Sequence, residues 1–151
     1  MTSVDLALLE IEHARYDHLF DSQTGLAKWA LLLDRTTVAL ARSRRTGSQV
    51  ALFVLDDPHF GSGPNDLTAI VATLLPRLRP DDTLARIGDL RLAVVCNEIR
   101  ADEDAALVAR RLIYGTGIIC GLGVALGATD DTPDGLISRA LRELSRSTVD
   151  G

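Results

Sequence analysis

Residues 83–96 have the sequence TLARIGDLRLAVVC, and this stretch decides the fold that we predict for the chain. It contains two runs of β-forming residues, 83–87 and 90–96, separated only by Gly88 and Asp89. Glycine in the first central position suits a two-residue turn between antiparallel strands. The stretch therefore predicts a β-hairpin.

The segments around this hairpin alternate between helical and strand patterns. Residues 49–56, QVALFVLD, form a nearly continuous apolar run that predicts a buried central strand. The other predicted elements are a helix at about 66–78 that Pro76 disturbs, an alanine-rich helix at 101–114, a strand at 117–126, and a helix at 133–147 with Thr132 as its N-cap. The order β-α-β-β-α-β-α predicts an α/β (α+β) fold of the ferredoxin-like type. Such a fold has a mostly antiparallel sheet with helices packed on one face.

Two further helices are predicted before this unit, at 3–20 and at about 26–45. Residues 21–25, DSQTG, break the helical pattern between them. We therefore divide the chain into an N-terminal helix, residues 1–20, and a domain, residues 21–151. The N-terminal helix shows no sustained heptad pattern.

The overall composition limits the classes of function. The chain has 151 residues and a net charge of −5, which disfavours nucleic acid and anionic lipid as partners. It has no apolar stretch long enough to span a membrane and no basic segment typical of a secretory signal, so we expect a cytoplasmic protein without membrane insertion. Cys96 and Cys120 lie in apolar runs and are expected to be buried, reduced thiols. The histidines have no metal-ligand spacing.

Five short segments, in order along the chain, are similar to landmarks of one bacterial signalling family. They are Asp21–Leu26, Leu52–Asp56 followed by His59-Phe60, Leu78–Arg86, Gly121–Ala125 and Leu136–Leu144. From about residue 17 to its end, the chain resembles a GGDEF (diguanylate cyclase) domain. The resemblance implies the same fold and a role in cyclic di-GMP signalling. It also implies that the N-terminal helix transmits signals or dimerises, and packing of this helix on its own domain is the alternative.

The resemblance fails at the residues that carry catalysis in this family. Family members join two GTP molecules with two divalent metals, which are held by an aspartate at the end of the first strand and by an acidic residue in the signature hairpin. Here Gly88 keeps the first signature glycine, Asp89 replaces the second, and Leu90 and Arg91 replace the acidic pair. Asp56 is a possible remnant of the strand-end carboxylate. We therefore predict a degenerate member, a pseudoenzyme with no catalytic residues, no metal and no cofactor.

The resemblance implies a second site, and the sequence pattern of that site is present. Arg79 and Asp82 fit the R-x-x-D pattern of the family's inhibitory site, which binds cyclic di-GMP, and Arg110 or Arg111 on the next predicted helix would add a further arginine. Arginine offers a planar fork to phosphate, and a carboxylate accepts guanine N–H groups. The competing interpretation is structural, because an aspartate before a strand is a common turn residue and arginines on a helix are commonly exposed.

These observations favour a regulatory signalling module that acts through a protein partner, self-association or cyclic di-GMP. Two alternatives remain. The first is a divergent, Mg²⁺-dependent nucleotide cyclase that uses Asp56 and Asp89. The second is a purely structural dimerisation domain.

Overall fold

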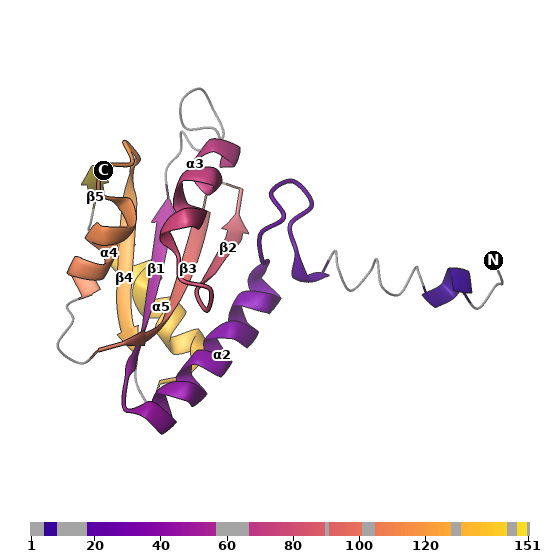
Figure 1. The fold of residues 1–151 in the computed structure, drawn as a ribbon, viewed down its shortest axis with the longest axis horizontal. Coiled ribbons are helices and arrows are strands. Elements are labelled where there is room, and N and C mark those ends of the chain that lie inside the picture. The colour runs from indigo at the N-terminus through magenta and orange to yellow at the C-terminus, as the bar shows by residue number, and fades with distance from the viewer. Residues whose placement is uncertain are drawn as a thin grey trace.

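The computed structural model describes residues 5–8, 18–56, 67–89, 91–100, 105–127, 131–144 and 148–150. This part of the chain forms an antiparallel sheet with the strand order β2-β3-β1-β4-β5, flanked by helices (Figure 1). The strands are β1 (Gln49–Asp56), β2 (Thr83–Gly88), β3 (Arg91–Ile99), β4 (Ile119–Gly127) and β5 (Thr148–Asp150). The helices are α2 (Trp29–Thr46), α3 (Leu67–Leu74), the short 3₁₀ helix η2 (Leu75–Arg77), α4 (Ala105–Ile113) and α5 (Pro133–Leu144).

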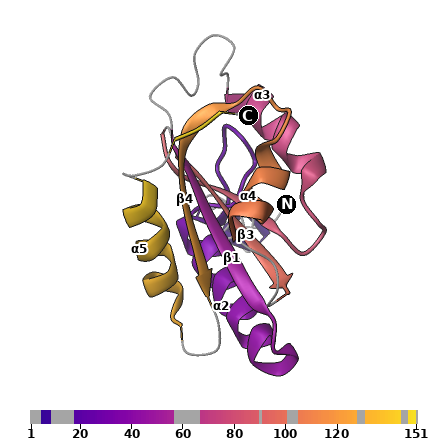
Figure 2. The same cartoon turned by 90° about the vertical axis from the view of Figure 1, so that its left-hand side faces the viewer.

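Strand β1 lies at the centre of the sheet, and both of its faces are covered. Ala51, Phe53 and Leu55 belong to the core that contains residues of α3 and α4. Val50, Leu52 and Val54 belong to a second core with residues of α2 and α5. Figure 2 shows α5 on one side of the sheet and α3 and α4 on the other. The prediction of flanking helices is confirmed, but their placement on one face is wrong. The additional helix α2 packs beside α5 and closes the second face.

Helix α2 begins three residues later than predicted because the preceding residues pair with the sheet. The main chain of Ala27 bridges to Phe20 and to Ala85, and the amide of Arg86 donates to the carbonyl of Ala27 at 2.8 Å. Residues 19–28 therefore form a small loop against the outer edge of β2. The helix ends before Gly47, whose amide donates to the carbonyl of Ser43 and whose φ of 73° turns the chain out of the helix.

Most other predicted elements are present with small shifts. Pro76 disturbs the predicted helix, as expected: α3 ends at Leu74, and the chain continues as the 3₁₀ turn η2. Thr132 caps α5, with its hydroxyl accepting the amide of Gly135 at 3.1 Å. Strand β5 was not predicted. Cys96 and Cys120 are buried thiols, as expected.

The predicted hairpin is present, but its turn lies one residue later than expected. Gly88 belongs to β2 and lies opposite Arg91 in the β2–β3 ladder, so the predicted turn at Gly88-Asp89 is wrong by one residue. Leu90 lies outside the described residues, as does most of the predicted N-terminal helix, of which residues 5–8 and 18–19 are described as helical. No helix in the described part of the chain is both long enough and apolar enough to span a bilayer.

Candidate ligand-binding site

The end of β1 and the start of β3 bring Asp56 and Arg91 together. The two residues are direct partners in the sheet ladder. The Nη2 and Nε atoms of Arg91 donate to Oδ2 of Asp56 at 2.9 and 3.1 Å. The side chain of Arg91 is 41% exposed and that of Asp56 is 30% exposed, so the ion pair contributes little to stability. Its chemical consequence is larger, because the guanidinium occupies a carboxylate oxygen and repels a divalent cation.

The main chain of the hairpin next to this pair is held by Arg86. Asp89 uses its main-chain carbonyl to accept a hydrogen bond from Nη2 of Arg86 at 3.1 Å. The same arginine side chain donates to the carbonyl of Gly88 at 3.3 Å. Within the described ranges, no three acidic, histidine or cysteine side chains form a group suited to a metal.

Arg86 also joins the hairpin to the loop before α2. Its Nη1 atom lies 3.2 Å from Oδ2 of Asp21 and 2.7 Å from Oε1 of Gln23. Oδ2 of Asp21 also accepts the amide and the hydroxyl of Thr24, at 2.9 and 2.7 Å. Burial raises the pKa of Asp21, but the hydrogen bonds from Thr24 and the charge of Arg86 outweigh burial and hold this pKa below its ordinary value of 3.8. Asp21 is therefore the ionised centre of this loop.

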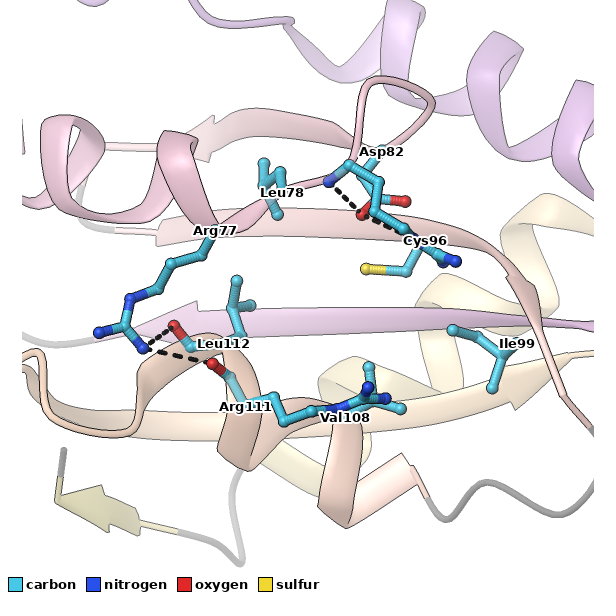
Figure 3. Close-up of a pocket in the computed structure, with 9 residues that line it drawn as sticks. Arg77, Leu78, Asp82, Cys96, Ile99, Val108, Arg111 and Leu112 are labelled. Carbon is cyan, nitrogen blue, oxygen red and sulfur yellow. Dashed lines mark hydrogen bonds and ion pairs between the residues drawn. The ribbon is translucent and has the colours of Figure 1, made fainter.

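A pocket of 190 Å³ lies between the η2–β2 connection, β3 and α4 (Figure 3). Its lining combines apolar side chains with the charged residues of the predicted site. The lining residues are Arg77, Leu78, Arg79, Asp82, Cys96, Ile99, Val108, Arg111 and Leu112. Arg79 and Asp82 are thus brought together, and Arg111 reaches the same pocket from α4. Arg110, which the sequence analysis proposed for this role, is exposed and is not part of the lining.

Hydrogen bonds hold the loop that contains Arg79 and Asp82. Oδ2 of Asp82 accepts the amide of Arg79 at 3.0 Å and lies 3.6 Å from its Nε. Oδ1 of Asp82 accepts the amide of Asn97 at 3.3 Å. The side chain of Asp82 is only 5% exposed, so these donors compensate for its burial. Asp82 therefore fixes the position of Arg79 through its main-chain amide and its guanidinium.

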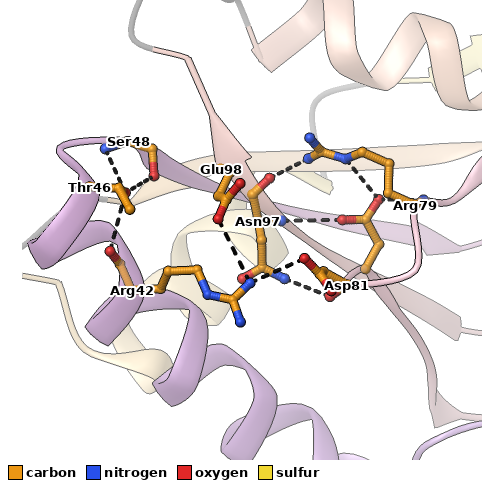
Figure 4. Close-up of polar contacts among 8 residues, drawn as sticks. Arg42, Thr46, Ser48, Arg79, Asp81, Asn97 and Glu98 are labelled. Atoms are coloured by element: carbon orange, nitrogen blue, oxygen red, sulfur yellow. Dashed lines mark hydrogen bonds and ion pairs between the residues drawn. The ribbon is translucent and has the colours of Figure 1, made fainter.

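Asn97 on β3 is the residue of this site that the sequence analysis missed (Figure 4). Its Nδ2 donates to the carbonyl of Asp81 at 2.6 Å, and its own carbonyl accepts Nη2 of Arg79. Asn97 lies at an irregularity in the β1–β3 pairing, and the next residue, Glu98, has a φ of 54°. The sequence held one signal for this role: Asn97 is a polar residue in an otherwise apolar run. A polar residue that is buried there needs hydrogen-bond partners nearby.

Helix α2 is tied to the other side of the same loop. Nη1 of Arg42 lies 3.3 Å from Oδ2 of Asp81 and 3.9 Å from Oε1 of Glu98 (Figure 4). The side chains of Asp81 and Glu98 are 63% and 51% exposed, so each ion pair contributes little on its own. The loop is therefore held mainly by the hydrogen bonds of Asp82 and Asn97.

Cys96 lies in the wall of the pocket beside Asp82 (Figure 3). Burial, reinforced by the negative charge of Asp82, raises the pKa of its thiol far above the ordinary range. The thiol thus remains protonated and unreactive, as expected of a packing residue.

Comparisons with known proteins agree with this fold. No family model matches the sequence. The chain is 31% identical over 109 residues to the diguanylate cyclase DgcP of Pseudomonas aeruginosa, an alignment that covers 66% of this chain but only 16% of the cyclase. The chain thus spans about one sixth of the length of this relative.

Solved structures extend the likeness over most of the chain. The GGDEF domain of PA1120 (TpbB or YfiN) from P. aeruginosa superposes with a TM-score of 0.69 at 23% identity, covering 83% of this chain and 86% of that one. The coiled coil and GGDEF domain of DgcB from Caulobacter crescentus, solved in complex with c-di-GMP, gives a TM-score of 0.71 at 20% identity, covering 94% and 86%. The chain thus has the fold of GGDEF domains, and over 109 residues it is similar in sequence to a diguanylate cyclase.

Proposed function

We propose that this chain is a non-catalytic regulatory domain that binds cyclic di-GMP in the pocket between the Arg79–Asp82 loop and α4. The observation that carries the proposal is the convergence of Arg79, Asp82 and Arg111 on one pocket. The complex of the structurally similar DgcB with c-di-GMP supports this choice of ligand.

The chemistry of the pocket suits one end of a guanine dinucleotide. The guanidinium groups of Arg79 and Arg111 offer paired donors to phosphate oxygens or to the acceptor edge of guanine. Leu78, Val108 and Leu112 offer apolar surface for the face of a base. The volume of 190 Å³ is below the range typical of pockets for drug-sized ligands, so one base would enter while the rest of the dinucleotide stays at the rim.

The ion pair between Asp56 and Arg91 supports the non-catalytic part of the proposal. Phosphoryl transfer depends on metal ions that neutralise the charge on the phosphates. The strand-end carboxylate that would hold such an ion already has a guanidinium partner at 2.9 Å. Binding a divalent cation there would require breaking this pair and placing the cation beside Arg91.

Calorimetric titration with cyclic di-GMP tests the ligand, and α4 supplies a matched pair of variants. We expect Arg79→Ala and Arg111→Ala each to weaken binding by about tenfold or more, because each removes a charge-assisted hydrogen bond. Arg110→Ala removes an arginine from the same helix outside the pocket, so its dissociation constant should stay within about twofold of wild type.

Two outcomes would overturn this proposal. Absence of heat with cyclic di-GMP, and equally with GTP and Mg²⁺, would leave a protein-interaction or dimerisation domain as the better interpretation. Equal losses in Arg110→Ala and Arg111→Ala would show that the ligand binds elsewhere on α4.

Incubation with GTP tests the cyclase alternative separately. We expect no cyclic di-GMP after prolonged incubation with GTP and either Mg²⁺ or Mn²⁺. The reason is that the guanidinium of Arg91 is paired with the Asp56 carboxylate, which would otherwise bind the metal. Chromatography of the nucleotides measures the product. Formation of cyclic di-GMP that Asp56→Asn abolishes would establish a divergent cyclase instead.

A further inference from the structure

Arg77, one of the residues that line the pocket, reaches from η2 to the end of α4 (Figure 3). Its Nη1 atom donates to the main-chain carbonyls of Tyr114, Arg111 and Leu112 at 2.6, 3.3 and 3.4 Å. The last carbonyls of a helix have no partner within the helix, and a cation near them is stabilised by the helix dipole. Arg77 thus acts as the C-terminal cap of α4 although it belongs to a different segment.

The hydrogen bonds at the end of α4 show what Arg77 contributes. The carbonyl of Arg110 accepts the amide of Tyr114, and the carbonyl of Ile113 accepts the amide of Thr116. The three other carbonyls of this turn, those of Arg111, Leu112 and Tyr114, accept Nη1 of Arg77. One side chain from η2 therefore completes the cap that the local backbone leaves open.

The turn after α4 is shaped around this guanidinium. Gly115 has a φ of 73°, a conformation that glycine adopts without strain. A Cβ atom at Gly115 would lie 4.0 Å from Nη2 of Arg77, so the turn comes into van der Waals range of the arginine. The contact is thus a specific docking of the helix end on η2.

The position of Arg77 in the chain relates this docking to the pocket. Arg77 lies two residues before Arg79. It also donates a hydrogen bond to the main-chain carbonyl of Arg111, whose side chain lines the pocket from α4. Helix α4 itself packs on β4. The hydrogen bonds of Arg77 therefore link the segment that contains Arg79 directly to the helix that contains Arg111.

We propose that Arg77 is the positioning residue of this pocket, which sets the spacing between Arg79 and Arg111 so that both engage one ligand. The inference rests on the proposed binding of cyclic di-GMP. Arg77 would act through the main chain of α4. Its loss should therefore misplace Arg111 without removing a ligand contact.

A double-mutant cycle in cyclic di-GMP affinity separates positioning from direct contact. We expect Arg77→Ala to weaken binding by about tenfold, and Arg77→Lys to recover part of the loss because an ammonium still reaches a carbonyl but lacks the planar fork. The double variant Arg77→Ala/Arg111→Ala should bind no more weakly than Arg111→Ala alone. Additive losses would mean that Arg77 contacts the ligand itself, and would overturn the proposal.

Hydrogen exchange in the absence of ligand tests the tie independently of the ligand. The amides of residues 110–114 should exchange faster in Arg77→Ala than in wild type, and Arg110→Ala serves as the control with an unchanged pattern. Unchanged protection in Arg77→Ala would overturn the positioning role. Failure of wild-type protein to bind cyclic di-GMP would refute the proposed function, while the exchange result would still report on the tie.

Discussion

Replacing Gly123 with alanine should destabilise the protein by more than about 3 kcal/mol, at the upper end of what overpacking costs. Gly123 lies on β4 where α5 approaches it most closely. An added Cβ would overlap the main-chain carbonyl oxygen of Ala140 and lie 2.9 Å from the amide nitrogen of Leu144. These are main-chain atoms of a helix, so no side-chain rotation relieves the overlap. Helix α5 would have to move off the sheet.

Urea unfolding of Gly123→Ala against Gly88→Ala measures this effect with a matched control. At Gly88, on β2 of the same sheet, an added Cβ would meet Cβ of Arg91 at 3.5 Å, an ordinary van der Waals contact. Gly88→Ala should therefore change the free energy of unfolding by less than about 1 kcal/mol. Similar free energies of unfolding for the two variants would contradict the close packing of α5 on β4.

Replacing Asp21 with alanine should cost about 3 kcal/mol at neutral pH, the second largest effect that we expect. The carboxylate accepts the amide and hydroxyl of Thr24 and pairs with Arg86 at 3.2 Å. Hydrogen bonds to a charged acceptor contribute about 1.5–3 kcal/mol each, and the side chains of Asp21 and Arg86 are only 17% and 15% exposed. Ser22→Ala, at an exposed position of the same turn, is the control and should be nearly neutral.

The effect of Asp21→Ala should depend on pH in a defined direction. The folded protein holds the pKa of Asp21 below its ordinary value of 3.8. The stabilisation by Asp21 is therefore fully present above pH 3.8. It is lost as the pH falls from there through the pKa of the folded protein. Urea unfolding of wild type and Asp21→Ala at pH 7 and near pH 3 measures the difference. A gap between the two proteins that does not narrow in acid would show that the carboxylate charge is not what stabilises the loop.

Much of the fold was predictable because its patterns are local. The apolar run of residues 49–56 identified the central strand. The Gly88-Asp89 pair identified the hairpin, although Gly88 itself belongs to β2. The order of elements, however, does not say which face a preceding helix covers, so the position of α2 was missed. The continuous apolar character of β1 was the relevant signal, since a strand buried on both faces cannot alternate. Strand β5 has only three residues, too few to show a period.

The candidate site was predictable only where a motif contained it. Arg79 and Asp82 were proposed because they match the R-x-x-D pattern of the family that the chain resembles, but their hydrogen bonds with Asn97 depend on tertiary contacts. The choice between Arg110 and Arg111 depended on helical phase. Val108 and Leu112 are buried, and Arg111 lies closer to them around the helix than Arg110 does. The tie from Arg77 joins residues more than thirty positions apart, which no sequence period reveals.

The main-chain bond between Arg86 and Ala27 has a consequence for behaviour in a crowded solution. An uncovered edge strand offers its amides and carbonyls to any other extended chain, and proteins with such edges tend to aggregate. The short loop before α2 lies along β2 and uses part of this edge. At the opposite side, β5 ends the sheet with only three residues. The loop before α2 therefore hinders other chains from pairing with β2, the edge strand of the hairpin.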